Sequence, residues 1–193
     1  MRVITGTAKG HRLKAPKGLA TRPMLDRVKE SLFSVLEGYA ALHGRVLDLY
    51  AGTGSLGIES LSRGAAFADF VEQRAHVCRI IQDNLRHTRL DPQARVHCMP
   101  VAQYVRHLPD TVRYDLIIMD PPYADPEIAQ TIQMIIEQGV NTAGGLLVVG
   151  HSPRVTLADT YLHWQRIKFR RLGDSCFSIY QPEPHPASDH SVQ

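Results

Sequence analysis

Residues 45–57, RVLDLYAGTGSLG, hold an apolar run followed at once by a glycine-rich turn. The run RVLDLY has the length and composition of a buried β-strand, and the residues from 55 onward, SLGIESLSRG, have the pattern of a helix. Glycine lacks a Cβ, so Gly52 and Gly54 let the backbone turn sharply and approach a ligand closely. The stretch therefore predicts a strand, a ligand-binding turn and a helix.

The same alternation of apolar runs and amphipathic segments continues toward the carboxyl end. Further strands are expected at 66–71, 94–99, 114–120 and 144–150, with helices at 74–87, 101–108 and 126–138. Strands that alternate with helices predict a parallel sheet covered on both faces. Two last β-like runs, 163–171 and 175–181, predict a terminal antiparallel pair. The expected fold is α/β and Rossmann-like, with a mostly parallel seven-stranded sheet.

The amino-terminal region differs from this pattern. Residues 2–14, RVITGTAKGHRLK, alternate short β-favouring pieces with glycines, which predicts a small N-terminal β-hairpin outside the main sheet. Thr21, two residues before Pro23, is typical of a helix start. The last stretch, PEPHPASDHSVQ, is rich in Pro, Ser and His, so we expect it to be disordered. We therefore expect an extension at 1–20, a domain at 21–181 and a tail at 182–193.

Length and composition exclude several classes of protein. A chain of 193 residues fits one domain, and 44% hydrophobic with 21% charged residues excludes a disordered chain. No apolar run approaches the roughly 18 to 20 residues that span a bilayer, and the N-terminus lacks the apolar core of a secretory signal. A cytoplasmic monomer without a membrane partner is expected. The cysteines, Cys78, Cys98 and Cys176, form no CxxC pair, and the histidines form no HxxxH or HExxH pair, so we expect reduced thiols and no metal.

Cations are concentrated in two places. Within the first thirty residues only Asp26 and Glu30 oppose a group of cations, namely Arg2, Lys9, Arg12, Lys14, Lys17, Arg22, Arg27 and Lys29. A second group comprises Arg166, Lys168, Arg170 and Arg171. Such clusters attract a phosphate backbone and release its counterions, although each alone is equally compatible with a solvated face.

The glycine turn points to a nucleotide-like cofactor. Gly52, Gly54 and Gly57 satisfy GxGxxG, a weak motif that dinucleotide sites share, and Glu72 ends the second expected strand, where a carboxylate holds ribose hydroxyls. Asp48, ahead of the glycines, can meet an ammonium group, which favours S-adenosylmethionine over a nicotinamide cofactor. Neighbouring residues of the same strand ends are assigned to this cofactor site as well: Tyr50, Ala51, Gln73, Pro100 and Val101.

A second motif, Asp120-Pro121-Pro122-Tyr123, directly follows the apolar run YDLIIM. Two prolines hold the turn rigidly, so the Asp120 carboxylate and nearby carbonyls can be aimed at one point, while Tyr123 offers a flat face to a base. An exocyclic NH2 is a poor nucleophile because its lone pair is delocalised into the ring. If Asp120 and the Pro121 carbonyl accept both amine hydrogens, the nitrogen is favoured in its pyramidal form. The motif predicts methylation of a base amine.

Together these residues resemble the RsmD-type 16S ribosomal RNA guanine-N2 methyltransferases. The resemblance runs from RVITGTAKGHRLKAP to GDSCFSIYQ, and its most specific part is TRPMLDRVKESLF, residues 21–33. It implies a class I S-adenosylmethionine-dependent methyltransferase fold, with 16S rRNA or the assembling small ribosomal subunit as partner. It also implies that the target is the N2 amine of a guanine of the position-966 class.

The resemblance also implies residue roles. Asp48, Gly52 and Gly54 would hold the methionine part of the cofactor, Glu72 its ribose, and residues 120–123 the target amine. Thr21 to Arg27 would line the site, with Arg22 or Arg27 near the cofactor carboxylate or the RNA. The remaining RNA contacts are expected from the N-terminal extension: Lys9, Arg12 and Lys14.

The sequence departs from the family in two places. Cys98-Met99-Pro100-Val101 stands where many class I methyltransferases have an Asp that accepts a hydrogen bond from the adenine amine, so backbone groups and apolar contacts must replace it. Met24-Leu25 replaces polar residues. Two alternatives stay open: a DNA or other RNA amine methyltransferase acting on adenine N6 or cytosine N4, and a non-catalytic RNA-binding assembly factor. About forty residues outside the core leave little room for a DNA-recognition domain. Measured binding of S-adenosylmethionine would distinguish an enzyme from the non-catalytic assembly factor.

Overall fold

The computed structural model describes residues 1–16, 26–122 and 125–183. The expected helix start at Thr21, the cofactor residue Arg22, the target-stacking residue Tyr123 and the expected disordered tail beyond Glu183 lie outside the described residues.

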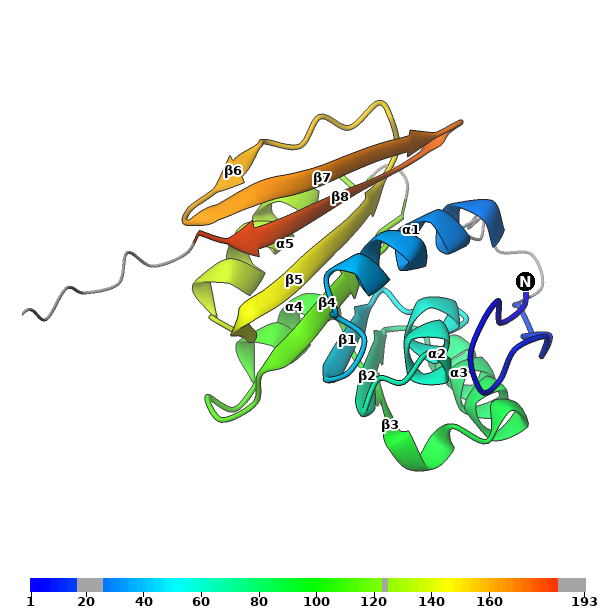
Figure 1. The fold of residues 1–193 in the computed structure, drawn as a ribbon. Coiled ribbons are helices and arrows are strands. Elements are labelled where there is room, and N and C mark those ends of the chain that lie inside the picture. The colour runs from blue at the N-terminus through cyan, green and yellow to red at the C-terminus, as the bar shows by residue number, and fades with distance from the viewer. Residues whose placement is uncertain (17–25, 123–124, 184–193) are drawn as a thin grey trace, which may run out of the picture.

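The strands form one sheet in the order β3-β2-β1-β4-β5-β8-β7-β6 (Figure 1). Their bounds are β1 Arg45–Leu49, β2 Phe67–Glu72, β3 Ala94–Cys98, β4 Tyr114–Met119, β5 Asn141–His151, β6 Thr160–Tyr161, β7 Trp164–Leu172 and β8 Ser175–Pro182. Strands β1 to β5 pair in parallel, whereas β8 runs antiparallel to both β5 and β7. The expected α/β fold and terminal antiparallel pair are confirmed. The two-residue β6, paired with the start of β7, adds an eighth strand.

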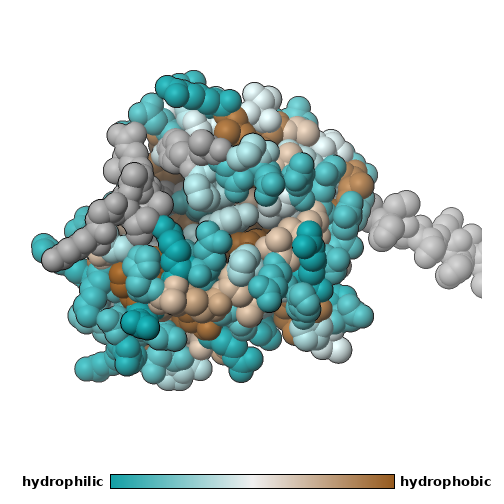
Figure 2. Space-filling model, turned by 180° about the vertical axis from the view of Figure 1, so that it is seen from behind, coloured by the Kyte–Doolittle hydropathy of each residue, from teal (hydrophilic) through white to brown (hydrophobic). Residues whose placement is uncertain are grey.

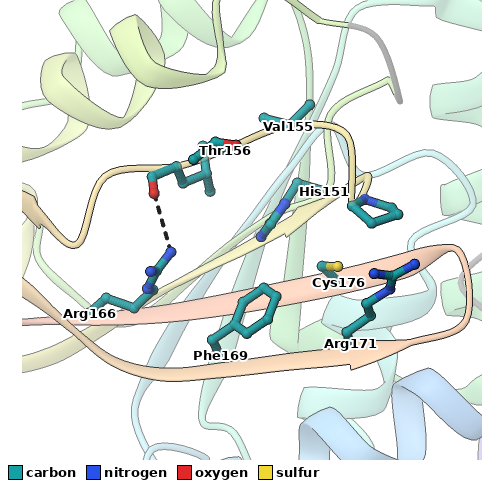
Figure 3. Close-up of a pocket in the computed structure, with 9 residues that line it drawn as sticks. His151, Val155, Thr156, Arg166, Phe169, Arg171 and Cys176 are labelled. Carbon is teal, nitrogen blue, oxygen red and sulfur yellow. Dashed lines mark hydrogen bonds between the residues drawn. The ribbon is translucent and has the colours of Figure 1, made fainter.

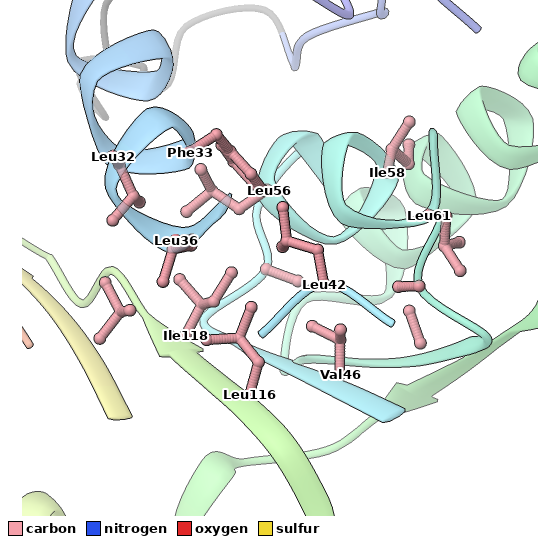
Figure 4. Packing of buried hydrophobic residues seen from close by; sticks show 14 of the residues in the cluster. Leu32, Phe33, Leu36, Leu42, Val46, Leu56, Ile58, Leu61, Leu116 and Ile118 are labelled. Carbon is pink, nitrogen blue, oxygen red and sulfur yellow. The ribbon is translucent and has the colours of Figure 1, made fainter. Parts of the chain in front are cut away.

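Helices cover both faces of this sheet. Their bounds are α1 Asp26–Gly38, α2 Ser55–Ser62, α3 Ala75–Thr88, α4 Val101–Arg106 and α5 Ile128–Glu137, with a 3-10 turn at Asp91–Gln93. The first three helices share one hydrophobic core with the sheet, and Figure 4 shows the part of it between α1, α2 and the strands β1 and β4. Helices α4 and α5 share a second core on the opposite face. In β4, Ile118 enters the first core and Met119 the second, so a strand buried on both faces gives the continuous apolar run seen in the sequence.

The N-terminal segment packs against α2 rather than forming a regular hairpin. One antiparallel bridge joins Arg2 to Arg12, and Gly6 and Gly10, both at φ 86°, turn the chain between them. The apolar residues Val3, Ala8 and Leu13 of this segment belong to the first core. A Cβ on Gly6 would overlap the carbonyl of Ser62 at the end of α2, so glycine is required there both for its backbone angle and for close packing.

A buried ion pair anchors this segment, and it corrects the expected cationic surface. Lys29 does not face solvent: its Nζ lies 3.1 Å from the Glu59 carboxylate, and the two side chains are 1% and 0% exposed. Nζ also donates to the Arg2 carbonyl at 2.6 Å, and Glu59 accepts the backbone N–H groups of Ile4 and Thr5. Burial lowers the pKa of Lys29, while the charge of Glu59 acts to raise it. Lys29 is therefore part of the internal structure and not of an RNA-binding face.

The outer surface is mixed. Seen from behind, hydrophilic side chains cover most of the face, and apolar side chains lie in small areas between them (Figure 2). Such a distribution is typical of a protein whose apolar residues lie in internal cores. Among the described residues, none of the helices is long and apolar enough to cross a membrane.

Candidate active site

The glycine turn and the Asp-Pro-Pro turn lie side by side. Strands β1 and β4 are parallel neighbours, with Leu49 opposite Met119, so the chain leaves both strands at the same edge of the sheet. Tyr50 and Asp120 are the next residues of the two strands. In open α/β sheets, ligands bind at this carboxyl edge, near the position where the strand order reverses. Here the order reverses between β1 and β4.

Left-handed backbone conformations shape the glycine turn. Tyr50, Gly52 and Gly54 have φ values of 57°, 54° and 76°. The Ala51 N–H donates to the Val71 carbonyl of the neighbouring strand at 3.0 Å, and the Gly54 N–H donates to the Ala51 carbonyl at 2.7 Å. These bonds fix the turn between β1 and α2.

The glycines of the turn serve different purposes. A Cβ on Gly54 would lie 3.0 Å from the Ile81 side chain, and one on Gly57 would overlap the Phe70 ring. At Gly52 the nearest atom to such a Cβ is the Tyr50 carbonyl oxygen at 3.8 Å, so only this glycine of the three faces open space. Core packing and a positive φ are therefore additional reasons for glycine at position 54, and the expected close approach of a ligand there stays a prediction.

Asp48 is buried beneath the turn. Its Oδ2 accepts the Gly57 N–H at 2.8 Å, which ties the first turn of α2 to β1. Burial raises the pKa of Asp48 well above its ordinary range, and the charges of Asp120 and Glu72 raise it further. Asp48 therefore supports the glycine turn, and its expected contact with the cofactor ammonium group stays a prediction.

Glu72, the last residue of β2, is also buried and faces the same turn. Its Oε2 accepts the Gly52 N–H at 3.2 Å, and its Oε1 accepts the N–H and Nε–H of Arg74 at 3.0 and 2.9 Å. Gln73 lies exposed beside it. The carboxylate is thus held in place at the strand end, where the sequence predicts a ribose contact.

The turn after β3 carries the residues expected near the adenine. Pro100 is exposed and precedes the first turn of α4, whereas the Val101 side chain is 6% exposed and packs in the second core. At Val101, therefore, the backbone is the part that can reach a ligand.

Cys78, on α3, donates its thiol hydrogen to the Glu72 carbonyl at 3.1 Å, and burial raises the pKa of Cys78 to about 12, so the thiol stays protonated. Cys78 and Cys176 are buried and Cys98 is exposed, and none of the three forms a disulfide in the structure.

Asp120 is partly buried at the end of β4, and burial raises the pKa of its carboxyl to about 6. A Cβ at position 150 would overlap the Asp120 carboxylate, so Gly150, near the end of β5, leaves the space that this carboxylate fills. Pro121 is buried, and the Pro122 carbonyl accepts the Asp125 N–H at 3.0 Å, which closes the turn.

The site as a whole suits a cationic ligand. Asp48 lies close enough to the carboxylates of Glu72 and Asp120 for both to raise its pKa. A ligand that carries sulfonium and ammonium groups would relieve this repulsion. These carboxylates fit S-adenosylmethionine on that ground, together with the open space at Gly52. Within the described ranges, His, Cys, Asp and Glu side chains form no group of three or more suited to a metal ion.

The expected RNA-contacting residues lie on the surface. Lys9, Arg12 and Lys14 of the N-terminal segment and Arg27 of α1 are exposed. Lys14 forms an exposed ion pair with Asp83, with a separation of 3.3 Å.

Asn84, a residue that the sequence analysis missed, connects the N-terminal segment to the glycine turn. Its Oδ1 accepts the Lys14 N–H at 2.8 Å, and its Nδ2 donates to the carbonyls of Lys14 and Thr53 at 3.1 and 2.9 Å. The cationic segment is therefore attached directly to the glycine turn. An Asn within an amphipathic helix gives little signal in sequence. Gly150 gives a clearer signal in the sequence, because a glycine inside a strand often marks the close approach of another group, here the Asp120 carboxylate.

The strand order, the glycine turn and the neighbouring Asp-Pro-Pro turn define a class I S-adenosylmethionine-dependent methyltransferase, with S-adenosylmethionine as its cofactor. The family model described as conserved hypothetical protein 95 matches residues 1–181. The chain belongs to this family, the RsmD-type methyltransferases.

Individual relatives agree with this assignment. The chain is 28% identical over 189 residues to Ribosomal RNA small subunit methyltransferase D of Escherichia coli K12, covering 98% of this chain and 93% of the relative. It is 30% identical over 183 residues to the protein of the same name from Haemophilus influenzae, covering 94% and 93%. Its structure is similar to that of a hypothetical protein from Thermus thermophilus, with a TM-score of 0.81, 30% identity and coverage of 94% of this chain and 99% of that one.

Proposed function

We propose that the protein transfers a methyl group from S-adenosylmethionine to the exocyclic N2 amine of a guanine in small-subunit ribosomal RNA, of the position-966 class. One observation carries the proposal: the Asp120 turn, stiffened by two prolines, directly neighbours the glycine turn across the β1–β4 pair. The names of the Escherichia coli and Haemophilus influenzae relatives support ribosomal RNA as the substrate.

The chemistry assigned to Asp120 follows from its position. When bound, S-adenosylmethionine supplies an electrophilic methyl group. The ionised Asp120 carboxylate accepts one hydrogen of the guanine amine, and the Pro121 carbonyl accepts the other, which favours a pyramidal nitrogen with its lone pair directed at the methyl carbon. As the new C–N bond forms, the C–S bond of the methyl group would break and its electron pair would stay on sulfur, which leaves as a neutral thioether. The nitrogen releases one proton, and Asp120 is the base proposed to receive it. Holding the amine in line makes the step effectively unimolecular.

Tyr123 is proposed as the stacking surface for the guanine. Stacking on an aromatic ring is worth about 1–3 kcal/mol per base and helps to offset the cost of unstacking the target. RNA binding is assigned to Lys9, Arg12 and Lys14, with Arg27 nearby on α1. Asn84 attaches this cationic segment to the glycine turn, so an RNA bound along it would pass close to the cofactor.

The test is incubation of the protein with isotope-labelled S-adenosylmethionine and one of three substrates, followed by nucleoside analysis. The substrates are undermethylated small subunits, free 16S rRNA and duplex DNA. Labelled N2-methylguanosine from either rRNA substrate is expected. Labelled N6-methyladenine or N4-methylcytosine would instead favour the other amine methyltransferases. Cofactor binding without any labelled nucleoside would favour an assembly factor. Asp120→Ala serves as the inactive control.

A further inference from the structure

A second cavity opens beside the end of β5, outside the residues assigned to cofactor and target. It has a volume of about 260 Å³ and lies between the loop at 153–157 and the strand β7. Figure 3 shows His151 between the two walls, with Val155 and Thr156 on the loop side and Phe169 and Arg171 on the strand side. We call this cavity the β5-end pocket.

The floor of the β5-end pocket is rigid and uncharged. His151 is buried, its Nδ1–H donates to the Ser152 carbonyl at 3.0 Å, and its Nε2 accepts the Ser178 hydroxyl at 3.1 Å. Burial lowers the pKa of His151, so the ring is neutral near pH 7. Cys176, 1% exposed, forms the neighbouring part of the floor. A neutral, fixed floor suits a flat uncharged group.

The strand wall presents an aromatic face with cations around it. Phe169 is 49% exposed, an unusual position for a large apolar side chain beside a cavity. The Arg166 guanidinium lies 5.6 Å from the centre of its ring, and the His151 ring lies 6.0 Å from it. Arg171, also exposed, donates its Nε–H to the Gly173 carbonyl at 3.2 Å. Exposed aromatic rings flanked by guanidinium groups are the usual elements of single-stranded nucleic-acid binding.

The pocket also lies next to the proposed transfer site. His151 directly follows Gly150, the residue that makes room for the Asp120 carboxylate. Successive strand residues face opposite sides of the sheet, so Asp120 and the pocket lie on the two sides of the end of β5. An RNA strand that placed a base at Asp120 and continued over this edge would bring a neighbouring nucleotide to Phe169. The volume is just below the roughly 300–1,000 Å³ of drug-sized ligand sites, so it suits one base.

We propose that the β5-end pocket binds one unpaired nucleotide that flanks the target guanine, with its base stacked on Phe169 and its phosphate facing Arg171. Lys168 and Arg170 alternate with these residues along β7 and pair with Ile179 and Phe177 of the first core, so they lie on the other side of the sheet, the side of Asp120. This proposal rests on the proposed RNA substrate. It gives a role to the second cationic group of the sequence, whose presence the transfer site does not explain.

The test compares variants of Phe169 and Arg171 with matched controls. Phe169→Ala removes the ring, and Phe169→Leu keeps an apolar side chain without an aromatic face. Tyr39→Ala, at an aromatic residue 42% exposed after α1, is the control for a lost surface ring. Arg171→Glu is paired with Arg113→Glu, an exposed arginine just ahead of β4. Each variant is measured for cofactor affinity and for KM and kcat on a 16S rRNA fragment. Binding without turnover is measured for that fragment and for assembled small-subunit particles.

Both Phe169 variants are expected to raise KM and weaken fragment binding by about tenfold or more, as loss of one stacked base predicts. Arg171→Glu is expected to act in the same direction, and cofactor affinity and the two controls are expected to stay at wild-type values. Ultraviolet cross-linking of the wild-type complex should attach a nucleotide to the peptide that contains Phe169.

Three results would overturn the proposal: wild-type KM in Phe169→Ala, wild-type KM in Phe169→Leu alone, or loss of binding to assembled particles with unchanged binding to the naked fragment. The second would show that Phe169 only packs, and the third that the pocket meets a protein. If the wild-type protein methylates no guanine amine, the proposed function fails separately, because fragment binding without turnover still reports on the pocket.

Discussion

The carboxylate of Asp120 lies over the Cα of Gly150, in the space that the side chain of any other residue at position 150 would fill. Asp120 directly follows β4 and Gly150 is the last residue but one of β5, and the parallel pairing of these strands places Met119 opposite Val149. The position of the proposed catalytic carboxylate therefore depends on the absence of a side chain on the next strand. This dependence can be tested without changing Asp120 itself.

Gly150→Ala is expected to lower kcat by on the order of 10- to 100-fold, because the added methyl group displaces the Asp120 carboxylate from the amine. Gly144→Ala is the matched control, since a Cβ at position 144 of the same strand meets no atom within 4 Å. Steady-state kinetics and cofactor titration of both variants check the prediction. Equal activity in the two variants would show that the space at Gly150 does not position Asp120.

Asp120→Asn keeps the size of the side chain but replaces one acceptor oxygen with a donor NH2. We expect kcat to fall by about 10²–10⁴-fold, the usual range for a lost acid–base group, with cofactor affinity changed by no more than a few fold. Isothermal titration with S-adenosylmethionine and single-turnover methylation measure the two quantities. A variant that retained wild-type turnover would remove Asp120 from the mechanism.

The pKa of Asp120 predicts the acid limb of the pH profile. Burial raises this pKa to about 6, and the ionised carboxylate is the form that accepts the amine hydrogen. As pH falls through 6, the active form is lost, so kcat/KM should fall about tenfold per pH unit below that point and stay level above it. A carboxyl with the ordinary pKa of 3.8 would leave the profile flat down to about pH 4. The profile of the wild-type protein between about pH 4.5 and 8 separates these cases.

The sequence predicted the strands and turns of the site but not its local contacts. Hydrophobic periodicity and turns with glycine or proline depend only on residues close together in the sequence. The strands β1 and β4 and the turns after them could therefore be located from the sequence alone. Whether Gly54 excludes a side chain because of a ligand or because of Ile81 depends on a residue 27 positions away, which no local pattern records. The same holds for Asn84, whose partners Lys14 and Thr53 become neighbours only after folding.

For Lys29 the sequence contains a sign of burial, its position in the helical period, but its charge was given more weight. It lies between Val28 and Leu32 on the buried side of α1, so helical periodicity alone would have placed it inside. Its charge instead led to its inclusion among the surface cations, because lysine is rarely buried without a partner. The partner, Glu59, lies on α2, where every residue is buried, so neither member of the pair could be recognised without the other.

Charge reversal at Lys9, Arg12 and Lys14 should weaken RNA binding and flatten its dependence on salt. Each lost phosphate contact lowers the slope of log affinity against log salt by about 0.7 for a single strand. All three side chains are exposed, so the fold should persist. Reversal of Arg106 and Arg113, exposed residues of α4 and of the loop before β4, provides the control. Binding measured at several salt concentrations would exclude the N-terminal segment as the RNA contact if both sets of variants gave the wild-type slope.

The Lys29–Glu59 pair should determine whether the N-terminal segment stays attached. Glu59→Ala leaves the buried charge of Lys29 without its counterion, so this variant should destabilise the protein by about 3–5 kcal/mol, as for a broken buried pair. In Lys29→Met the Glu59 carboxylate keeps Arg63, whose Nε lies 2.9 Å away, so this variant should destabilise the protein less. Only Glu59→Ala also removes the acceptor of the Ile4 and Thr5 N–H groups. Hydrogen exchange at these two amides should therefore rise sharply in Glu59→Ala and much less in Lys29→Met under conditions where both variants are folded. Equal exchange in the two variants would mean that the ion pair stabilises the core without holding the segment, and the cationic residues would then be positioned by Asn84 and the apolar contacts of Val3, Ala8 and Leu13 instead.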